Sequence, residues 1–185
     1  MLLPNHYLIT PSLKDEKTFL SSLEKSLDAG ITLIQLRSKG MELALYLRLA
    51  EKVIKMAQDY HCKVLLTEAS LVRKLGAAGL HLNSKQLATC EIRPISSNYL
   101  LAASGHTLGE LKKAERLQTD FAVLSPVKFT QSHPDLTPLG WDKFANIVNS
   151  VKMPVYALGG VSSDDTDDAI RAGGQGIAGA KGLWL

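Results

Sequence analysis

The stretch LIQLRSKG, residues 33–40, reads as a buried strand that ends in a row of polar donors. Its apolar residues supply strand character, while Gln35, Arg37 and Lys39 stand at alternate positions. An extended chain directs such positions to one side. One amide and two cations are costly to bury without an anionic partner. Spacing alone favours a row that faces water, whereas a place at the open end of a barrel favours a phosphate or diphosphate ligand.

Short apolar runs alternate with helical patterns along the rest of the chain. We expect strands over residues 6–12, 33–38, 63–68, 79–83, 99–104, 121–125, 154–158 and 176–180. We expect helices over residues 15–29, 42–60, 70–75, 84–88, 107–117 and 141–151, and one more that begins after Ser162 or Ser163. Thr107 and Glu110 have the spacing of a capping box. The helix over residues 42–60 carries its apolar stripe at Leu43, Leu47, Ala50, Val53, Ile54 and Ala57.

Alternating strands and helices predict a parallel α/β fold, and eight strands are the number that closes a (β/α)8 TIM barrel. The pattern covers residues 1–185 as a single domain and encodes no helix after the eighth strand. We therefore expect a barrel that lacks its last helix. Such a chain is either a fragment of a longer protein or covers the gap by self-association, for instance as a homodimer. A doubly wound open sheet is the alternative, which periodicity does not exclude.

Composition narrows the classes of partner. The chain of 185 residues is 45% hydrophobic and 21% charged, as is ordinary for a soluble globular protein. Its net charge of +3 comes from Lys and Arg residues spread along the helices, so we expect no nucleic-acid surface. Cys62 and Cys90 make neither a disulfide framework nor a zinc site, which favours a reducing, cytoplasmic setting. No apolar run approaches the length of a membrane span.

In a barrel, the carboxyl ends of the strands line one mouth, and chemistry takes place there. The residues at these ends are Gln35, Arg37, Lys39, Thr67, Glu68, His81, Asn83, Ser104, His106, Thr130, Ser132, His133, Gly159, Gly160 and Lys181. This mouth is rich in hydroxyls, amides and cations and holds few carboxylates. The composition indicates an anionic ligand.

Two of these ends suggest specific chemistry, each with a simpler structural alternative. Gly159 and Gly160 precede a capped helix and can present bare N–H groups to a phosphate, supported by Lys181, although a Gly-Gly pair also serves tight turns. His106 could move a proton near neutral pH, although a lone histidine is more often structural. We interpret His81 as a core or supporting residue. Four aspartates between residues 164 and 168 fit a helix N-terminus better than a metal site.

Five segments resemble the thiamin phosphate synthase and TenI superfamily. They are QLRSK at residues 35–39, GLHL at 79–82, SGHT at 104–107, FAVLSPV at 121–127 with Thr130 beyond it, and PVYALGG at 154–160. The segments cover nearly the whole chain in order. The second half is most similar to a subgroup in which the barrel is fused behind a Nudix hydrolase, so a fused or partner Nudix domain is expected.

The resemblance implies a barrel that joins hydroxymethylpyrimidine diphosphate to thiazole phosphate and releases diphosphate. Carried over by position, Gln35, Arg37 and Lys39 hold the diphosphate, and Ser104 lies near the pyrimidine or the leaving group. Thr130, Ser132 and His133 contribute from the loop, Gly159, Gly160 and Lys181 bind the thiazole phosphate, and Thr67 and Asn83 add substrate contacts.

The chain departs from the family pattern where Mg²⁺ is held. The usual Asn-Asp pair is Thr67-Glu68, and Lys85-Gln86 stand near the usual second Asp. Because Mg²⁺ prefers several oxygen ligands with carboxylates among them, Glu68 alone is a weak metal ligand. Two alternatives follow from this departure. One is a TenI-like thiazole tautomerase that uses His106 as acid and base; the other is a non-catalytic phosphate-ligand-binding domain that partners a Nudix hydrolase.

Overall fold

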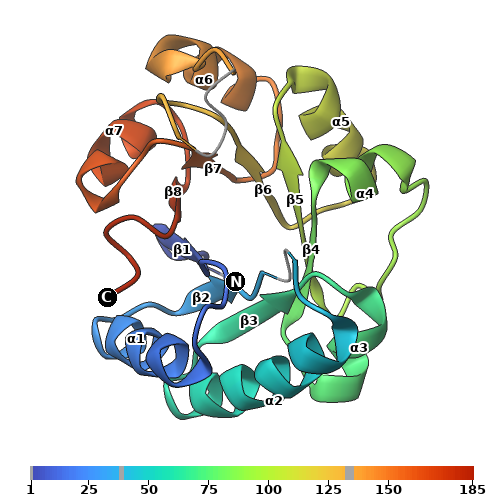
Figure 1. Ribbon diagram of the computed structural model, residues 1–185. Coiled ribbons are helices and arrows are strands. Elements are labelled where there is room, and N and C mark those ends of the chain that lie inside the picture. Colours follow the sequence, from blue (N-terminus) through green and yellow to red (C-terminus); the bar gives the residue numbers. More distant parts are fainter. Residues whose placement is uncertain (1, 38–39, 132–135) are drawn as a thin grey trace.

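The computed structural model describes residues 2–37, 40–131 and 136–185. Eight parallel strands form a closed barrel in sequence order, and the first strand pairs with the eighth (Figure 1). The strands are β1 (His6–Ile9), β2 (Leu33–Gln35), β3 (Lys63–Leu66), β4 (Gly79–Leu82), β5 (Leu100–Gly105), β6 (Phe121–Leu124), β7 (Val155–Leu158) and β8 (Gly176–Gly179). Closure confirms the predicted TIM barrel and excludes the open sheet.

Helices surround the barrel (Figure 1). They are α1 (Glu16–Asp28), α2 (Leu43–Asp59), α3 (Ala69–Leu75), α4 (Ser84–Thr89), α5 (Leu108–Arg116), α6 (Gly140–Val148) and α7 (Thr166–Arg171), with a 3₁₀ turn, η1 (Ser163–Asp165), before α7. The predicted elements are all present, with ends that move by a few residues. The first strand was expected to reach residue 12 but ends at Ile9, because Pro11 has no N–H for the ladder.

Among the described helices, side chains cap the starts of α1, α4 and α5. Asp15 accepts a hydrogen bond from the Thr18 N–H at 2.7 Å at the start of α1. At α5, the Thr107 side chain accepts from the Glu110 N–H as expected. The expected capping box is incomplete there, because the Glu110 carboxylate accepts from the His106 N–H at 2.7 Å.

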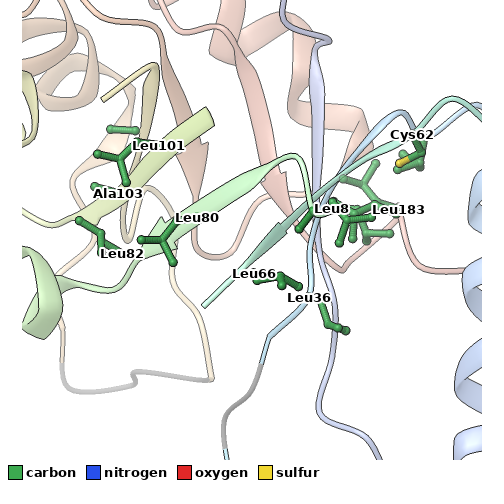
Figure 2. Packing of buried hydrophobic residues seen from close by; sticks show 14 of the residues in the cluster. Leu8, Leu36, Cys62, Leu66, Leu80, Leu82, Leu101, Ala103 and Leu183 are labelled. Atoms are coloured by element: carbon green, nitrogen blue, oxygen red, sulfur yellow. The ribbon is translucent and has the colours of Figure 1, made fainter. Parts of the chain in front are cut away.

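Strand alternation divides the apolar side chains into two groups. One group fills the barrel interior: Tyr7, Leu33, Leu65, Ala102, Phe121, Val123, Tyr156 and Ala178. The other lies between strands and helices, and Figure 2 shows part of it, including Leu80, Leu82 and Leu101. The predicted stripe of α2 is partly wrong, since Leu43 is 60% exposed. Leu43 opens the helix, and the packed face begins one turn later at Tyr46.

In the described residues no helix follows β8, as predicted. The chain instead turns back between α7 and α1 (Figure 1). Leu183 is buried in the outer core, and the Trp184 ring lies 4.8 Å from the ring of Phe19 on α1. The Leu185 N–H donates to the Ser26 hydroxyl at 3.1 Å. These last residues therefore cover part of the face of α1. Across the described ranges, the helices are all too short or too polar to cross a bilayer.

Candidate active site

A polar layer closes the barrel interior at the carboxyl ends of the strands. Gln35, Thr67, Ser104 and Ser125 each follow an interior-facing apolar residue by two positions, so they extend the same inward rows. Gln35 is 7% exposed, and Thr67 is 9% exposed. Ser104 and Ser125 are half-buried. The sequence prediction that polar residues gather at one mouth is consistent with this geometry.

Hydrogen bonds join the ends of β1, β2 and β3. The buried Thr10 hydroxyl accepts from the Arg37 N–H at 3.0 Å. The Tyr46 hydroxyl, on α2, donates to the Leu36 carbonyl at 2.9 Å and accepts from the Thr67 N–H at 3.0 Å. Burial raises the pKa of Tyr46, so it stays a neutral donor. The backbone that carries Gln35 and Arg37 is thus held from both sides.

The ends of β3 and β4 are joined through α4. The Gln86 side chain donates from Nε2 to the Thr67 carbonyl at 3.2 Å, while its Oε1 accepts from the Asn83 N–H at 2.9 Å. The Asn83 side-chain oxygen accepts from the Gln86 N–H at 2.9 Å, which completes a capping box. Asn83 therefore caps α4, and its expected contact with substrate stays a prediction.

A second connection crosses the barrel interior. Nδ1 of His81 lies 2.8 Å from the Tyr7 hydroxyl, and Nε2 lies 2.7 Å from the Ser104 hydroxyl. Burial lowers the pKa of His81 to about 3, so the ring is neutral at pH 7. This agrees with the interpretation of His81 as a core or supporting residue. Tyr7 was not expected at the site, although its inward register on the first strand is the signal that points to it.

His106, at the end of β5, is held by the end of β6. Its Nδ1 lies 2.8 Å from the Ser125 carbonyl oxygen, which can only accept a hydrogen bond. Nδ1 therefore carries the ring proton in the neutral form, and Nε2 keeps a lone pair. The residue is half-buried. The arrangement allows His106 to act as a base.

Gly159 and Gly160 receive the loop that follows β6. The Lys128 N–H donates to the Gly159 carbonyl at 2.9 Å. A Cβ at Gly160 would lie 2.3 Å from the Phe129 carbonyl oxygen, and both glycines have positive φ. Glycine is required here by the close approach of that loop. The contact with this loop therefore accounts for the pair by itself, and phosphate binding by the two glycines stays a prediction.

A charge cluster lies beside this turn. Nζ of Lys128 lies 2.5 Å from Oδ1 of Asp165 and 5.9 Å from the centre of the Trp141 ring. Burial alone would raise the pKa of the Asp165 carboxyl, but hydrogen bonds from Lys128 and the Ser162 N–H, with the charges of Lys128 and Lys181, hold that pKa below its usual value. Asp165 thus completes the predicted helix start and holds Lys128. Lys181 is exposed and lies within electrostatic range of the same carboxylate.

The side chains do not suit a Mg²⁺ ion held by protein carboxylates. Within residues 2–37, 40–131 and 136–185, no group of three or more His, Cys, Asp and Glu side chains could hold a metal. Glu68 is half-buried and precedes α3 as its N-cap residue, close enough to raise the pKa of Tyr46. Mg²⁺ needs a fuller set of oxygen ligands than one carboxylate supplies.

Most of the predicted site residues lie at the mouth. Gln35 and Ser104 lie at the ends of β2 and β5. Arg37, Thr67, His106 and the two glycines follow their strands within two residues, and Thr130 lies half-buried in the loop after β6. Three predicted residues, Lys39, Ser132 and His133, lie outside the described residues. The sequence did not identify the residues whose side chains support the site by hydrogen bonds or ion pairs, which are Tyr7, Thr10, Tyr46, Lys128 and Asp165.

The comparisons with known proteins agree with this geometry. The family model of thiamine monophosphate synthase matches residues 6–183. A protein named putative thiamine-phosphate synthase 2, from Aquifex aeolicus, is 33% identical over 180 residues, which are 97% of this chain and 97% of that protein. A thiamine-phosphate synthase from Methanobrevibacter smithii is 29% identical over 174 residues, which are 93% of this chain and 83% of that protein.

A solved structure supports the shared fold. It is thiamine phosphate pyrophosphorylase from Pyrococcus furiosus, which is similar with a TM-score of 0.80 at 24% identity, over 98% of this chain and 88% of that one. The family match spans nearly the whole barrel, and a relative of full length exceeds 30% identity. The chain therefore belongs to the thiamine monophosphate synthase family.

Proposed function

We propose that the chain joins hydroxymethylpyrimidine diphosphate to thiazole phosphate and releases diphosphate. One observation carries the proposal. The Gln35 side chain is 7% exposed and has no hydrogen-bond partner among the described residues, although it lies in the polar layer of the mouth. Arg37 follows two positions later; its N–H bonds Thr10, but its guanidinium has no partner within the described ranges. An amide and a guanidinium placed in this way suit the oxygens of a diphosphate.

The proposed reaction exchanges one bond for another at the pyrimidine methylene carbon. The bond from this carbon to the diphosphate oxygen breaks, and diphosphate leaves with the electron pair. The thiazole nitrogen then forms the new bond to the same carbon. Gln35 and Arg37 would stabilise the charge that grows on the leaving diphosphate, since donors aimed at developing charge lower the barrier. Lys39 is proposed to join them.

The remaining predicted residues would position the two substrates. We place the pyrimidine against Ser104 and the thiazole phosphate near Gly159, Gly160 and Lys181. Contacts from Thr67, Asn83, Thr130, Ser132 and His133 are part of the same proposal. Because the carboxylates for a protein-held Mg²⁺ do not fit, no step is assigned to the metal. The synthases of this family are expected to use Mg²⁺, so its effect on this chain has to be measured.

A second candidate function rests on His106. Its Nδ1 is committed to the Ser125 carbonyl, which leaves Nε2 free to take a proton from a ligand. A thiazole tautomerase would move one proton between two positions of the thiazole ring and would need no diphosphate. Under this alternative, His106→Gln removes the activity, whereas Arg37→Ala leaves it largely intact.

The direct test is an assay of the purified chain with both substrates, with and without added Mg²⁺. Thiamin phosphate should form, and its absence under both conditions would refute the proposal. Arg37→Ala should weaken diphosphate binding by about 1.5–3 kcal/mol, the range of a charge-assisted hydrogen bond. Arg48→Ala is the matched control, because Arg48 is an exposed arginine on the outer helix α2. Isothermal titration calorimetry with inorganic diphosphate measures both variants, and equal affinities would remove Arg37 from the site.

A further inference from the structure

A series of hydrogen bonds runs from the buried barrel interior to the mouth through Tyr7, His81 and Ser104. The two contacts measure 2.8 Å and 2.7 Å. Tyr7 is 0% exposed and His81 1% exposed, whereas Ser104 is half-buried at the open end. The three residues come from β1, β4 and β5, and β1 is not a neighbour of the other two. These hydrogen bonds therefore cross the barrel interior and link strands on different sides.

The buried Tyr7 hydroxyl determines where the protons of this series lie. Its one hydrogen-bond partner within the described ranges is Nδ1 of His81. The neighbouring Tyr156 packs its ring against that of Tyr7, but its hydroxyl bonds the Pro4 carbonyl oxygen at 2.5 Å and makes no hydrogen bond to Tyr7 within the described residues. A buried O–H without an acceptor loses the hydrogen bond that it makes to water in the unfolded chain. Tyr7 therefore donates to Nδ1.

The direction of this first bond sets the second. Burial keeps His81 neutral, with its pKa lowered to about 3, so the ring carries one proton. Because Nδ1 accepts from Tyr7, that proton resides on Nε2 and is donated to Oγ of Ser104. The Ser104 hydroxyl therefore already accepts one hydrogen bond. Its own proton has no acceptor among the described residues and is available to the mouth.

We propose that Tyr7 and His81 fix the Ser104 hydroxyl as a hydrogen-bond donor, so that the ligand atom above Ser104 must be an acceptor. Resting on the proposed function, that atom is an unprotonated ring nitrogen of the pyrimidine. A hydroxyl without this support could turn to donate or accept and would tolerate an amino group at the same place. Tyr7 and His81 act through Ser104 and are positioning residues. Specificity then arises because a site that donates a hydrogen bond rejects an analogue without an acceptor.

The first test needs no ligand. Protein labelled with ¹⁵N in its histidines is examined by NMR at pH 7, and the His81 ring is assigned by its disappearance in His81→Gln. The ring should carry its proton on Nε2, with a bare Nδ1. A proton on Nδ1 in the wild-type protein would overturn the proposal, because Ser104 would then donate to His81 rather than to the ligand.

The second test compares hydroxymethylpyrimidine diphosphate with an analogue in which C–H replaces the ring nitrogen. Wild-type protein should prefer the pyrimidine by about three- to tenfold, the range of one neutral hydrogen bond. Ser104→Ala should abolish this preference, and Tyr7→Phe should reduce it while leaving the affinity for inorganic diphosphate unchanged. General loss of structure would lower all three affinities together. An unchanged preference in Tyr7→Phe would show that Tyr7 does not orient the Ser104 hydroxyl.

These outcomes separate the two proposals. If wild-type protein binds neither diphosphate compound, the proposed function fails, and the assignment of the acceptor to a pyrimidine fails with it. If it binds both compounds equally, the proposed function survives and the present inference is refuted. The NMR result decides the proton positions in either case.

Discussion

Acidification from pH 7 to pH 5 should lower the free energy of unfolding by about 2 kcal/mol because of His81 alone. In the folded protein, burial lowers the pKa of His81 to about 3, whereas an unfolded histidine has a pKa of roughly 6.5. Below pH 6.5 the unfolded chain therefore binds a proton that the folded protein does not bind. The free energy of unfolding falls by up to about 1.4 kcal/mol for each pH unit between the two pKa values. Relative to high pH, where His81 is neutral in both states, the free energy of unfolding is lower by about 0.2 kcal/mol at pH 7 and by about 2 kcal/mol at pH 5.

The assay is urea unfolding at the two pH values, followed by tryptophan fluorescence, for wild type and His81→Gln. Glutamine keeps a donor and an acceptor but does not titrate. Burial also lowers the pKa of His6, and Asp165 has a lowered pKa, but both groups remain in the variant. Their contributions cancel when the two pH dependences are subtracted. The variant should be less stable at pH 7 yet lose about 2 kcal/mol less on acidification. Equal pH dependences in the two proteins would refute the reasoning.

Three further predictions follow from packing. Trp184→Ala should lower the free energy of unfolding by about 1–3 kcal/mol, since it removes a half-buried ring that packs on Phe19 of α1. The exposed neighbour is the control: Leu185→Ala should change this free energy by less than about 0.5 kcal/mol. Gly160→Ala should cost at least about 2 kcal/mol more than Gly140→Ala, because both have positive φ but only Gly160 faces a backbone clash. Cys62 should resist thiol reagents, since burial raises its pKa to about 12, so the folded protein should titrate one fast thiol of its two. Denaturation curves and thiol counting measure these effects.

The alternation of strands and helices was predictable because it depends on local periodicity. Barrel closure does not follow from periodicity, because a doubly wound open sheet uses the same local pattern; its prediction rested on the count of eight strands and on the family resemblance. The sequential strand order and the pairing of β1 with β8 show it. The exposure of Leu43 shows a similar limit. Its spacing fits the apolar stripe of α2, but spacing alone does not show how far the packed face of the barrel extends.

At the mouth, residues with conspicuous chemistry were predictable and their supports were not. Gln35 and His106 stand out as polar residues at strand ends. Tyr46 was hidden within an apolar helix pattern, and its bonds to two strand ends depend on how α2 packs. Lys128 and Asp165 are 37 residues apart in sequence, and no local rule pairs them. Such contacts arise from tertiary structure.

The bonds that join neighbouring strand ends have a consequence for the thermodynamics of binding. Side-chain hydrogen bonds hold the first six strand ends in place without a ligand; they are made by Thr10, Tyr46, Gln86, His81 and His106. The conformational entropy of ordering these groups is thus lost during folding rather than during association. A mouth whose backbone is already ordered leaves more of the interaction free energy available as affinity. For this mouth, a tight complex with a small anion does not require a large contact area.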